Sequence, residues 1–267
     1  MPETHHPAIR TDIPHSARVW NYWMGGKDNY EIDRMVGDAS LAIDPDITTM
    51  AVESRRFLTR AVRLLAGELG ITQFLDIGTG LPSTDNTHEV AQSLAPAARV
   101  LYVDNDPLVL AHVRAQTSGA QGVTACLEAD FHSPGRILTE AHAVLDLTRP
   151  VAAMFMGVLG HADSTADLLR IVRETVAALP SGSYLVFWDG TVDSDAYVKL
   201  CLEYAKSGGL PYRPRPEEEL RAVFDGLELL EPGFVPLPRW RPVVSSTSES
   251  TAPVSDISAY GGMARKP

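Results

Sequence analysis

The 267-residue chain has little cysteine, fewer basic than acidic side chains and no long apolar run. Cys126 and Cys201 lie far apart without metal-ligand spacing, so we expect no metal site and thiols kept reduced in the cytoplasm. No apolar run approaches the roughly 20 residues of a membrane span, and the polar residues 1–10 lack the apolar segment of a signal peptide. The net charge of −11 argues against binding to a nucleic-acid backbone, which needs a basic surface.

The chain has an ordinary globular composition, with 45% hydrophobic and 21% charged residues, enough for one large α/β domain with additions. Its most informative stretch is residues 74–80, Phe-Leu-Asp-Ile-Gly-Thr-Gly. The apolar residues favour a strand covered on both faces, and Gly78 and Gly80 favour a sharp turn that a ligand can approach closely. Ser83 or Thr84 is placed to cap a following helix. Strand, glycine turn and helix form the nucleotide-binding corner of an open α/β sheet.

Asp76 decides which nucleotide this corner suits. The dinucleotide fingerprint G-x-G-x-x-G would need a third glycine where Ser83 stands. A carboxylate two residues before Gly78 would repel a pyrophosphate and attract a cationic amino-acid head. S-adenosylmethionine (SAM) has an ammonium and a sulfonium and no phosphate, so it meets this requirement. An ordinary strand-to-loop turn with two glycines remains an alternative at this point.

The rest of the chain alternates between strand and helix patterns. Strand-like runs at 99–104, 122–128, 151–156 and 184–188 are separated by helical patterns at 84–94, 107–116 and 164–179. This alternation predicts parallel crossovers and a doubly wound sheet. The later pattern predicts helices at 194–206 and 217–224, a strand at 227–230, a long exposed loop at 241–253 and a closing strand at 258–265. We therefore expect a seven-stranded, mostly parallel sheet with an antiparallel last strand and helices on both faces.

Acidic residues stand where the second and third predicted strands end. Asp104 is placed to hold a ribose diol, because Asp106 can cap the next helix in its stead. Asp130 and Phe131 follow the third strand, where an adenine would lie. The acid can accept a hydrogen bond from the exocyclic amine, and the ring can cover the base. A loop acid and a core phenylalanine are the alternative interpretation of this pair.

The residues before the first strand predict a cap. Patterns at 16–24 and from 30 onward indicate two short helices, and a long helix at 46–69 leads into the first strand. We expect residues 1–45 to form a loosely attached arm and a helical lid over the cleft. Residues 46–267 then form the Rossmann-like SAM-binding domain.

The turn between the two lid helices, residues 21–30, is expected to complete the SAM site. Lys27 can bind a carboxylate, either of SAM or of an acidic substrate, or it can be a solvated turn residue. Trp20 and Trp23 suit either core packing or a cover over the ligand.

Together these segments closely resemble an actinobacterial family of SAM-dependent methyltransferases, long labelled a domain of unknown function. The segments that carry the resemblance are 17–22, 25–30, 76–82, 104–107 and 129–131, and the likeness extends over nearly the whole chain. It implies the Rossmann-like class I methyltransferase fold and SAM binding, without a settled substrate. The residues expected to bind the cofactor are Asp76, Gly78, Thr79, Gly80, Asp104, Asn105, Asp130, Phe131, Met156, Gly157, Asn21, Gly26 and Lys27.

No catalytic residue is assigned by sequence. Methyl transfer mainly needs nucleophile and methyl held about 3 Å apart and aligned, and a general base helps a hydroxyl acceptor. Candidates are His161 and Tyr30, followed by His88, Asp28 and Asp189, and each of them also fits a capping, packing or solvated role. In the family pattern Leu and His are contiguous, whereas here Gly160 separates Leu159 from His161.

We predict a methyltransferase that acts on a small molecule, as a monomer or homodimer, without a nucleic-acid or membrane partner. A non-catalytic SAM-binding sensor or regulator is the alternative. An NAD(P)-dependent oxidoreductase is disfavoured by Asp76 and by the missing third glycine.

Overall fold

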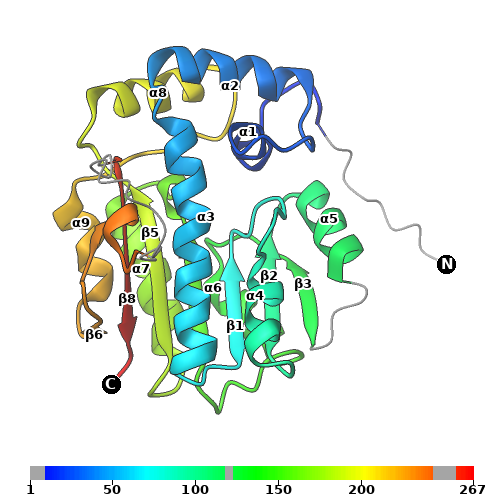
Figure 1. The fold of residues 1–267 in the computed structure, drawn as a ribbon, viewed down its shortest axis with the longest axis vertical. Coiled ribbons are helices and arrows are strands. Elements are labelled where there is room, and N and C mark those ends of the chain that lie inside the picture. Colours follow the sequence, from blue (N-terminus) through cyan, green and yellow to red (C-terminus); the bar gives the residue numbers. More distant parts are fainter. Residues whose placement is uncertain (1–9, 118–122, 243–256) are drawn as a thin grey trace, which may run out of the picture.

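The computed structural model describes residues 10–117, 123–242 and 257–267. Within them, eight strands form one sheet in the order β3-β2-β1-β4-β5-β8-β6, and β7 pairs with β8 (Figure 1). The strands are β1 (Gln73–Ile77), β2 (Arg99–Asp104), β3 (Thr124–Glu128), β4 (Ala152–Met156), β5 (Tyr184–Gly190), β6 (Glu228–Leu229), β7 (Val235–Pro236) and β8 (Ala259–Arg265).

The first five strands are parallel, and β8 inserts antiparallel between β5 and β6, so the prediction of a mostly parallel sheet with an antiparallel last strand is confirmed. The short β7 is an additional strand that the sequence pattern does not indicate. The predicted loop at 241–253 and the arm at the amino terminus fall largely outside the described residues. Strand order reverses at β1, which is flanked by β2 and β4, and this is where an open α/β sheet forms a crevice at its carboxyl edge.

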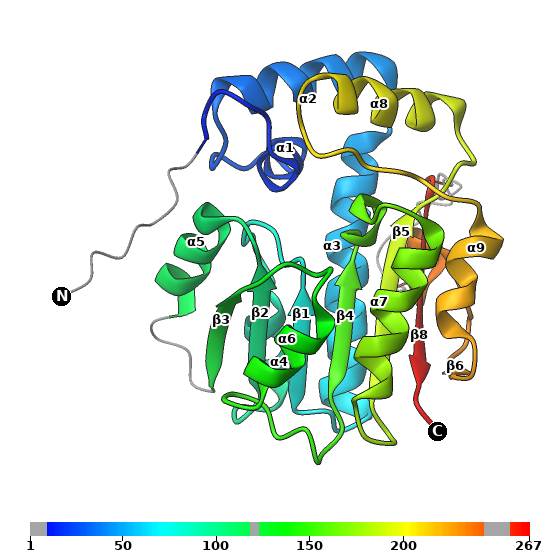
Figure 2. The ribbon, with the colours of Figure 1, turned by 180° about the vertical axis from the view of Figure 1, so that it is seen from behind.

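The helices cover both faces of the sheet and its carboxyl edge (Figures 1 and 2). In the two core clusters, α3 to α5 pack on one face, whereas α6, α7 and α9 pack on the other. The remaining helices, α1, α2 and α8, lie above the carboxyl ends of the strands. The bounds are α1 (Ser16–Trp23), α2 (Glu31–Ile43), α3 (Ile47–Arg63, continued by a π-helical turn at Leu64–Glu68), α4 (Thr87–Leu94), α5 (Pro107–Thr117), α6 (Pro134–Ala141), α7 (Thr165–Ala177), α8 (Asp195–Lys206) and α9 (Glu217–Arg221).

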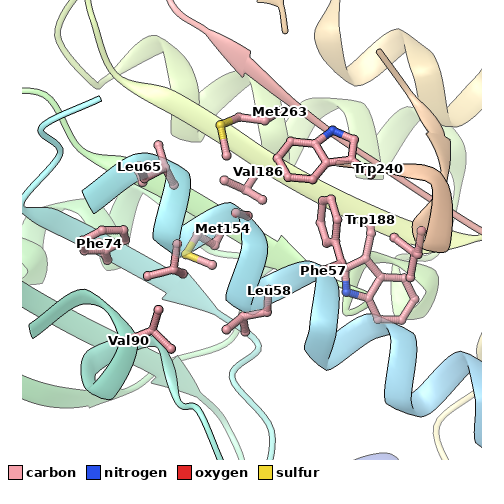
Figure 3. Close-up of a cluster of buried hydrophobic side chains, with 14 of the residues drawn as sticks. Phe57, Leu58, Leu65, Phe74, Val90, Met154, Val186, Trp188, Trp240 and Met263 are labelled. Carbon is pink, nitrogen blue, oxygen red and sulfur yellow. The ribbon is translucent and has the colours of Figure 1, made fainter. Parts of the chain in front are cut away.

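Alternation along the central strands divides the core into two layers. Phe74 of β1 and Val186 of β5 contribute to the cluster under α3, and the neighbouring Leu75 and Leu185 contribute to the cluster under α7. Figure 3 shows Phe57 of α3 among the side chains of the first layer. The ring centroids of Phe57 and Trp240 lie 5.0 Å apart in an edge-to-face arrangement. This packing fixes α3 along the sheet and carries its amino-terminal half up to the carboxyl edge.

The helix after the glycine turn begins later than predicted. Ser83 and Thr84 lie in the loop, and Asn86 caps α4. The backbone N–H of Asn86 donates to Glu89 Oε2 at 2.8 Å, and the N–H of Ser83 donates to Asn86 Oδ1 at 3.0 Å. The prediction of a helix start at Ser83 or Thr84 was therefore wrong, because Asn86 and Glu89 form a capping box three residues further on. Among the described residues, no helix combines the length and the apolar character needed to cross a bilayer.

Candidate functional site

A cavity lies where the carboxyl ends of β1, β2, β4 and β5 meet the helices above them. Its floor and walls include Asp76, Gly78, Thr79, Gly80, Asp104, Asn105, Phe131, Met156, Gly157 and His161. The helical cap contributes Trp20, Trp23 and Met24 from α1 and the residue after it, and Tyr197, Leu200 and Tyr204 from α8. Segments far apart in the sequence thus enclose one site.

The glycine turn brings the backbone close to its neighbours. Gly78 has φ of +72°, and a Cβ there would lie 2.3 Å from a Val158 methyl carbon, so the position accepts only glycine. Gly80 also has a positive φ, of +66°, but a Cβ there would meet nothing within 4 Å. The space that a side chain at Gly80 would fill is therefore available to a ligand.

Asp104 is fixed in place at the end of β2. Its Oδ2 accepts from the Gly80 N–H and its Oδ1 accepts from the Asp106 N–H, both at 2.9 Å. Burial raises the pKa of this carboxyl, and the two backbone bonds oppose that rise. Each carboxylate oxygen keeps a second lone pair, so Asp104 can still accept hydrogen bonds from a ligand in the cavity.

Asp76 lies at the bottom of the cavity with 3% of its surface exposed. Its Oδ2 accepts from Thr87 Oγ1 at 2.7 Å. Burial raises the pKa of Asp76 to about 6, although the Thr87 bond and the nearby Arg55 guanidinium both favour the charged form. A cation placed beside this carboxyl would offset its desolvation and lower its pKa.

His161 lines the cavity as a neutral imidazole. Its Nδ1 lies 3.0 Å from the carbonyl oxygen of Pro211. Because a carbonyl only accepts, Nδ1 carries the proton, and Nε2 keeps a lone pair. Burial lowers the pKa of His161 to about 4, so the ring stays uncharged at neutral pH. Nε2 is therefore unprotonated and free to accept a proton, although its surroundings disfavour the imidazolium ion and lower its basicity.

A buried ion pair joins the two helices of the lid, and a ring stack and a histidine–aspartate contact attach the lid to the main domain. Trp20 of α1 stacks on Trp188 of β5 with ring centroids 5.8 Å apart. Arg18 of α1 lies 2.9 Å, Nε to Oδ2, from Asp33 of α2, and both side chains are buried. Near the start of α1, His15 Nδ1 lies 3.2 Å from Asp106 Oδ2, at the tip of β2. These contacts hold α1 over the cavity.

Several predicted site residues do not line the cavity. Asn21 holds the turn after α1: its Oδ1 accepts from the Asp28 N–H and from Asn29 Nδ2, both at 3.0 Å. Gly26 lies against Asn21, since a Cβ there would come within 2.3 Å of the amide. Lys27 is exposed, and Asp130 binds the backbone N–H and ring of His132 in place of facing the cavity.

The other acid–base candidates also lie outside the cavity lining. Tyr30 caps α2, and its ring lies under the guanidinium of Arg18, with 5.1 Å between the ring centroid and Cζ of Arg18. His88 packs beside Tyr102, whose hydroxyl lies 2.8 Å from the His88 Nδ1. Asp189 is buried behind Tyr212, whose hydroxyl donates to Oδ1. Among the candidates of this group, only His161 is part of the cavity.

The sequence interpretation missed Arg55 and Tyr212 as cavity residues. Arg55 stands on α3, one position after Ser54 and three before Leu58, which line the same wall. A helical wheel of the 46–69 segment groups these positions on one side, which is a usable signal. Tyr212 lies in the proline-rich connector after α8, where no periodicity places it.

An open parallel sheet with an antiparallel strand beside β5, and an acid-preceded glycine turn at its switch point, defines a Rossmann-like SAM-dependent methyltransferase. The family model described as S-adenosyl methyltransferase matches residues 2–267, so the chain belongs to that family. It is an enzyme that uses S-adenosyl-L-methionine, and the resemblance found in its sequence is confirmed.

Solved structures agree with this assignment. A DUF574 family protein from Streptomyces avermitilis is 42% identical, with a TM-score of 0.90 over 97% of this chain and 100% of that one. A methyltransferase candidate from Thermobifida fusca is 38% identical, with a TM-score of 0.85 over 96% of each chain. The mitomycin 7-O-methyltransferase, at 16% identity and a TM-score of 0.50 over 94% of this chain and 68% of that one, shares the fold alone. Among functionally curated proteins, none matches the chain.

Proposed function

We propose that this methyltransferase acts on a small, largely apolar acceptor bound between the lid and the ends of β4 and β5. The observation that carries the proposal is the division of the cavity into two chemical regions. Acidic side chains and the glycine turn lie at the β1 and β2 end, and aromatic and aliphatic side chains lie toward the lid. The second group consists of Trp20, Trp23, Trp188, Tyr197, Leu200 and Leu210. An apolar wall of this kind suits a planar molecule better than a charged macromolecule.

The polar region fits SAM. Asp104 accepts from the ribose hydroxyls, and the backbone of 78–80 lies against the nucleoside where a Cβ at Gly80 would project into open space. Phe131, Met156 and Asn105 surround the adenine side, and Asp76 faces the ammonium. SAM supplies an activated methyl group on its sulfonium. The protein holds both partners in line and excludes water, which contributes most of the rate enhancement.

His161 is the group that accepts the acceptor's proton. Its Nδ1–H is held by the Pro211 carbonyl, which leaves Nε2 as the base. The apolar surroundings favour a neutral histidine, so the proton is passed on to solvent after transfer rather than retained.

The chain divides by role into residues 1–45, with the helical lid of α1 and α2, and residues 46–267, with the SAM-binding sheet. In this proposal the lid residues that meet the ligand are Trp20, Trp23 and Met24, and the turn at Asn21, Gly26 and Lys27 supports them. Both cysteines are free thiols, which fits a reducing cytoplasm as the place of action.

Calorimetry with SAM and with its demethylated product tests the cofactor site. Asp104→Asn is expected to weaken SAM binding by about tenfold or more, because it replaces a charged acceptor at the ribose. Asp130→Asn is the matched control, an acid at the next strand's tip whose side chain lies outside the cavity lining, and it should change affinity less than about twofold. Equal losses in both variants would contradict the assignment of Asp104.

Release of the demethylated product tests the acceptor class. The panel consists of 2-naphthol, 4-nitrocatechol and 8-hydroxyquinoline, with a lysine-rich peptide and transfer RNA as the alternative classes. Turnover with a planar phenol is expected. Transfer only to the peptide or the RNA would overturn the proposal. With the best acceptor, His161→Asn should lower kcat by about 10²-fold or more at unchanged SAM affinity, whereas His112→Asn, outside the cavity lining, should not.

A further inference from the structure

Arg55 is a cation inside the cavity for which the proposed roles give no task. It stands on α3, whose amino-terminal half reaches the carboxyl edge of the sheet, and it lines the same wall as Asp76. Burial lowers the pKa of its guanidinium, and the nearby Asp76 carboxylate opposes that shift. A half-buried arginine of this kind needs acceptors to replace the part of its water shell that it has lost.

The protein supplies only part of this requirement. Nη2 of Arg55 donates to Asn86 Oδ1 at 3.2 Å and, over longer distances of 3.4 and 3.5 Å, to the carbonyl oxygens of Thr84 and Asp85. Nε is buried and has no hydrogen-bond partner in the described part of the chain. The loop before α4 thus holds Nη2 of the guanidinium, and the neighbouring Nε donor is unused.

Together, Arg55 and Asp76 present opposite charges to the same end of the cavity. The amino-acid head of SAM carries an ammonium and a carboxylate on one carbon. We propose that Arg55 binds that carboxylate while Asp76 binds the ammonium, an inference that rests on the proposed placement of SAM. Guanidinium and carboxylate form paired, charge-assisted hydrogen bonds, and the unused Nε provides a donor for one of them. The exposed Lys27, which the sequence suggested for a carboxylate, does not line the cavity.

With this pairing, the enzyme recognises both charged groups of the amino-acid part of SAM. Adenosine derivatives that keep the sulfonium and ammonium but lack the carboxylate cover the half-buried Arg55 without giving it a partner. Such ligands therefore lose more binding free energy than one contact supplies, because the unpaired guanidinium keeps its desolvation penalty.

The test compares SAM with decarboxylated SAM, which differs by the carboxylate alone, using calorimetry on the full chain. The wild type should bind SAM about tenfold or more tightly than the decarboxylated ligand. In Arg55→Met this preference should fall to about twofold or less, because the loss falls on SAM only. Arg55→Lys keeps the charge without the planar fork and should give an intermediate preference. Arg56→Met, at the exposed neighbouring position, is the matched control and should keep the wild-type preference.

Each other outcome points elsewhere. Equal binding of the two ligands by the wild type overturns the role of Arg55, even where Arg55→Met does not fold. A similar loss for both ligands in Arg55→Met assigns Arg55 a structural role in holding the loop before α4. Absence of SAM binding to the wild type would contradict the proposed cofactor site itself, which separates that failure from a failure of this inference.

Discussion

The hydroxyl of Thr87, the first residue of α4, donates a 2.7 Å hydrogen bond to the carboxyl of Asp76 on β1. This bond and the charge of Arg55 do not fully compensate for burial, because the pKa of Asp76 is still raised to about 6. Burial therefore destabilises the ionised form of Asp76. A ligand with an ammonium beside Asp76 would stabilise the ionised form, whereas a ligand with a pyrophosphate would destabilise it further.

The affinity for SAM should consequently depend on pH. The ammonium binds the ionised form of Asp76, so binding lowers a pKa of about 6, and protons are released when SAM binds near or below that pH. We expect the highest affinity near pH 7 and a decrease approaching tenfold per unit as the pH falls below about 6. Calorimetry between pH 5 and pH 8 measures it.

Asp76→Asn is the control for this pH profile. It should bind SAM weakly and with no step near pH 6, even though Asp189, whose pKa burial also raises to about 6, is retained. A step that persists in Asp76→Asn would assign the titration to another group and contradict the role of Asp76.

The same substitution should increase the stability of the empty protein. A carboxyl whose pKa is higher in the folded state than in the unfolded chain binds its proton more tightly when folded, so its ionisation lowers the free energy of unfolding as the pH rises from about 4 to about 6. Asparagine keeps an acceptor for Thr87 and has no charge. At pH 8 we expect Asp76→Asn to raise the free energy of unfolding by about 1–3 kcal/mol. Denaturation in urea at pH 8 and pH 4.5 checks this, and a gain of equal size at both pH values would refute the electrostatic explanation.

Much of the fold follows from sequence because its signals are local. Consecutive apolar positions such as Phe74 and Leu75 mark a strand covered on both faces, and the alternation of strands with helices predicts parallel crossovers. The sequence interpretation made no prediction for α6, although Ser133 and Pro134 are a usual helix start. Helix boundaries depend on which of several caps forms, and Asn86 prevails over Ser83 through its partner Glu89.

The site was less accessible to this reasoning than the fold. Residues predicted from strand ends, such as Asp104 and Met156, line the cavity because parallel strands present their carboxyl ends at one edge. Arg55 lies well before the glycine turn in sequence, and only the packing of α3 on the sheet brings it beside Asp76. The opposite happens with Lys27, which was predicted to bind a carboxylate at the site but is exposed to solvent.

The lid should depend on the ion pair between Arg18 and Asp33. Arg18 is 2% exposed and Asp33 is fully buried, so Arg18→Met leaves a buried carboxylate without its cation and should cost about 3–5 kcal/mol. Hydrogen exchange should become faster in α1 and α2 first, and SAM should dissociate faster. Arg56→Met, which removes an exposed partner of Glu53, should stay within about 0.5 kcal/mol of the wild type. If exchange in the lid were equally slow in both variants, the pair would not hold the lid.

Alanine at the two glycines of the turn should separate stability from binding. Gly80→Ala adds a methyl group where nothing lies within 4 Å, so its cost to stability is limited to about 1–2 kcal/mol for a positive φ. The same methyl group occupies the space assigned to the nucleoside, and SAM affinity should fall by about tenfold or more. Gly78→Ala pays the same backbone penalty and also drives a carbon to 2.3 Å from Val158, so it should destabilise the protein more.

Thermal unfolding measures the stability of both variants, and calorimetry measures their affinity for SAM. If Gly80→Ala bound SAM as tightly as the wild type, the cofactor would not lie against this turn, and the placement of Asp76 and Arg55 at its amino-acid end would have to be abandoned.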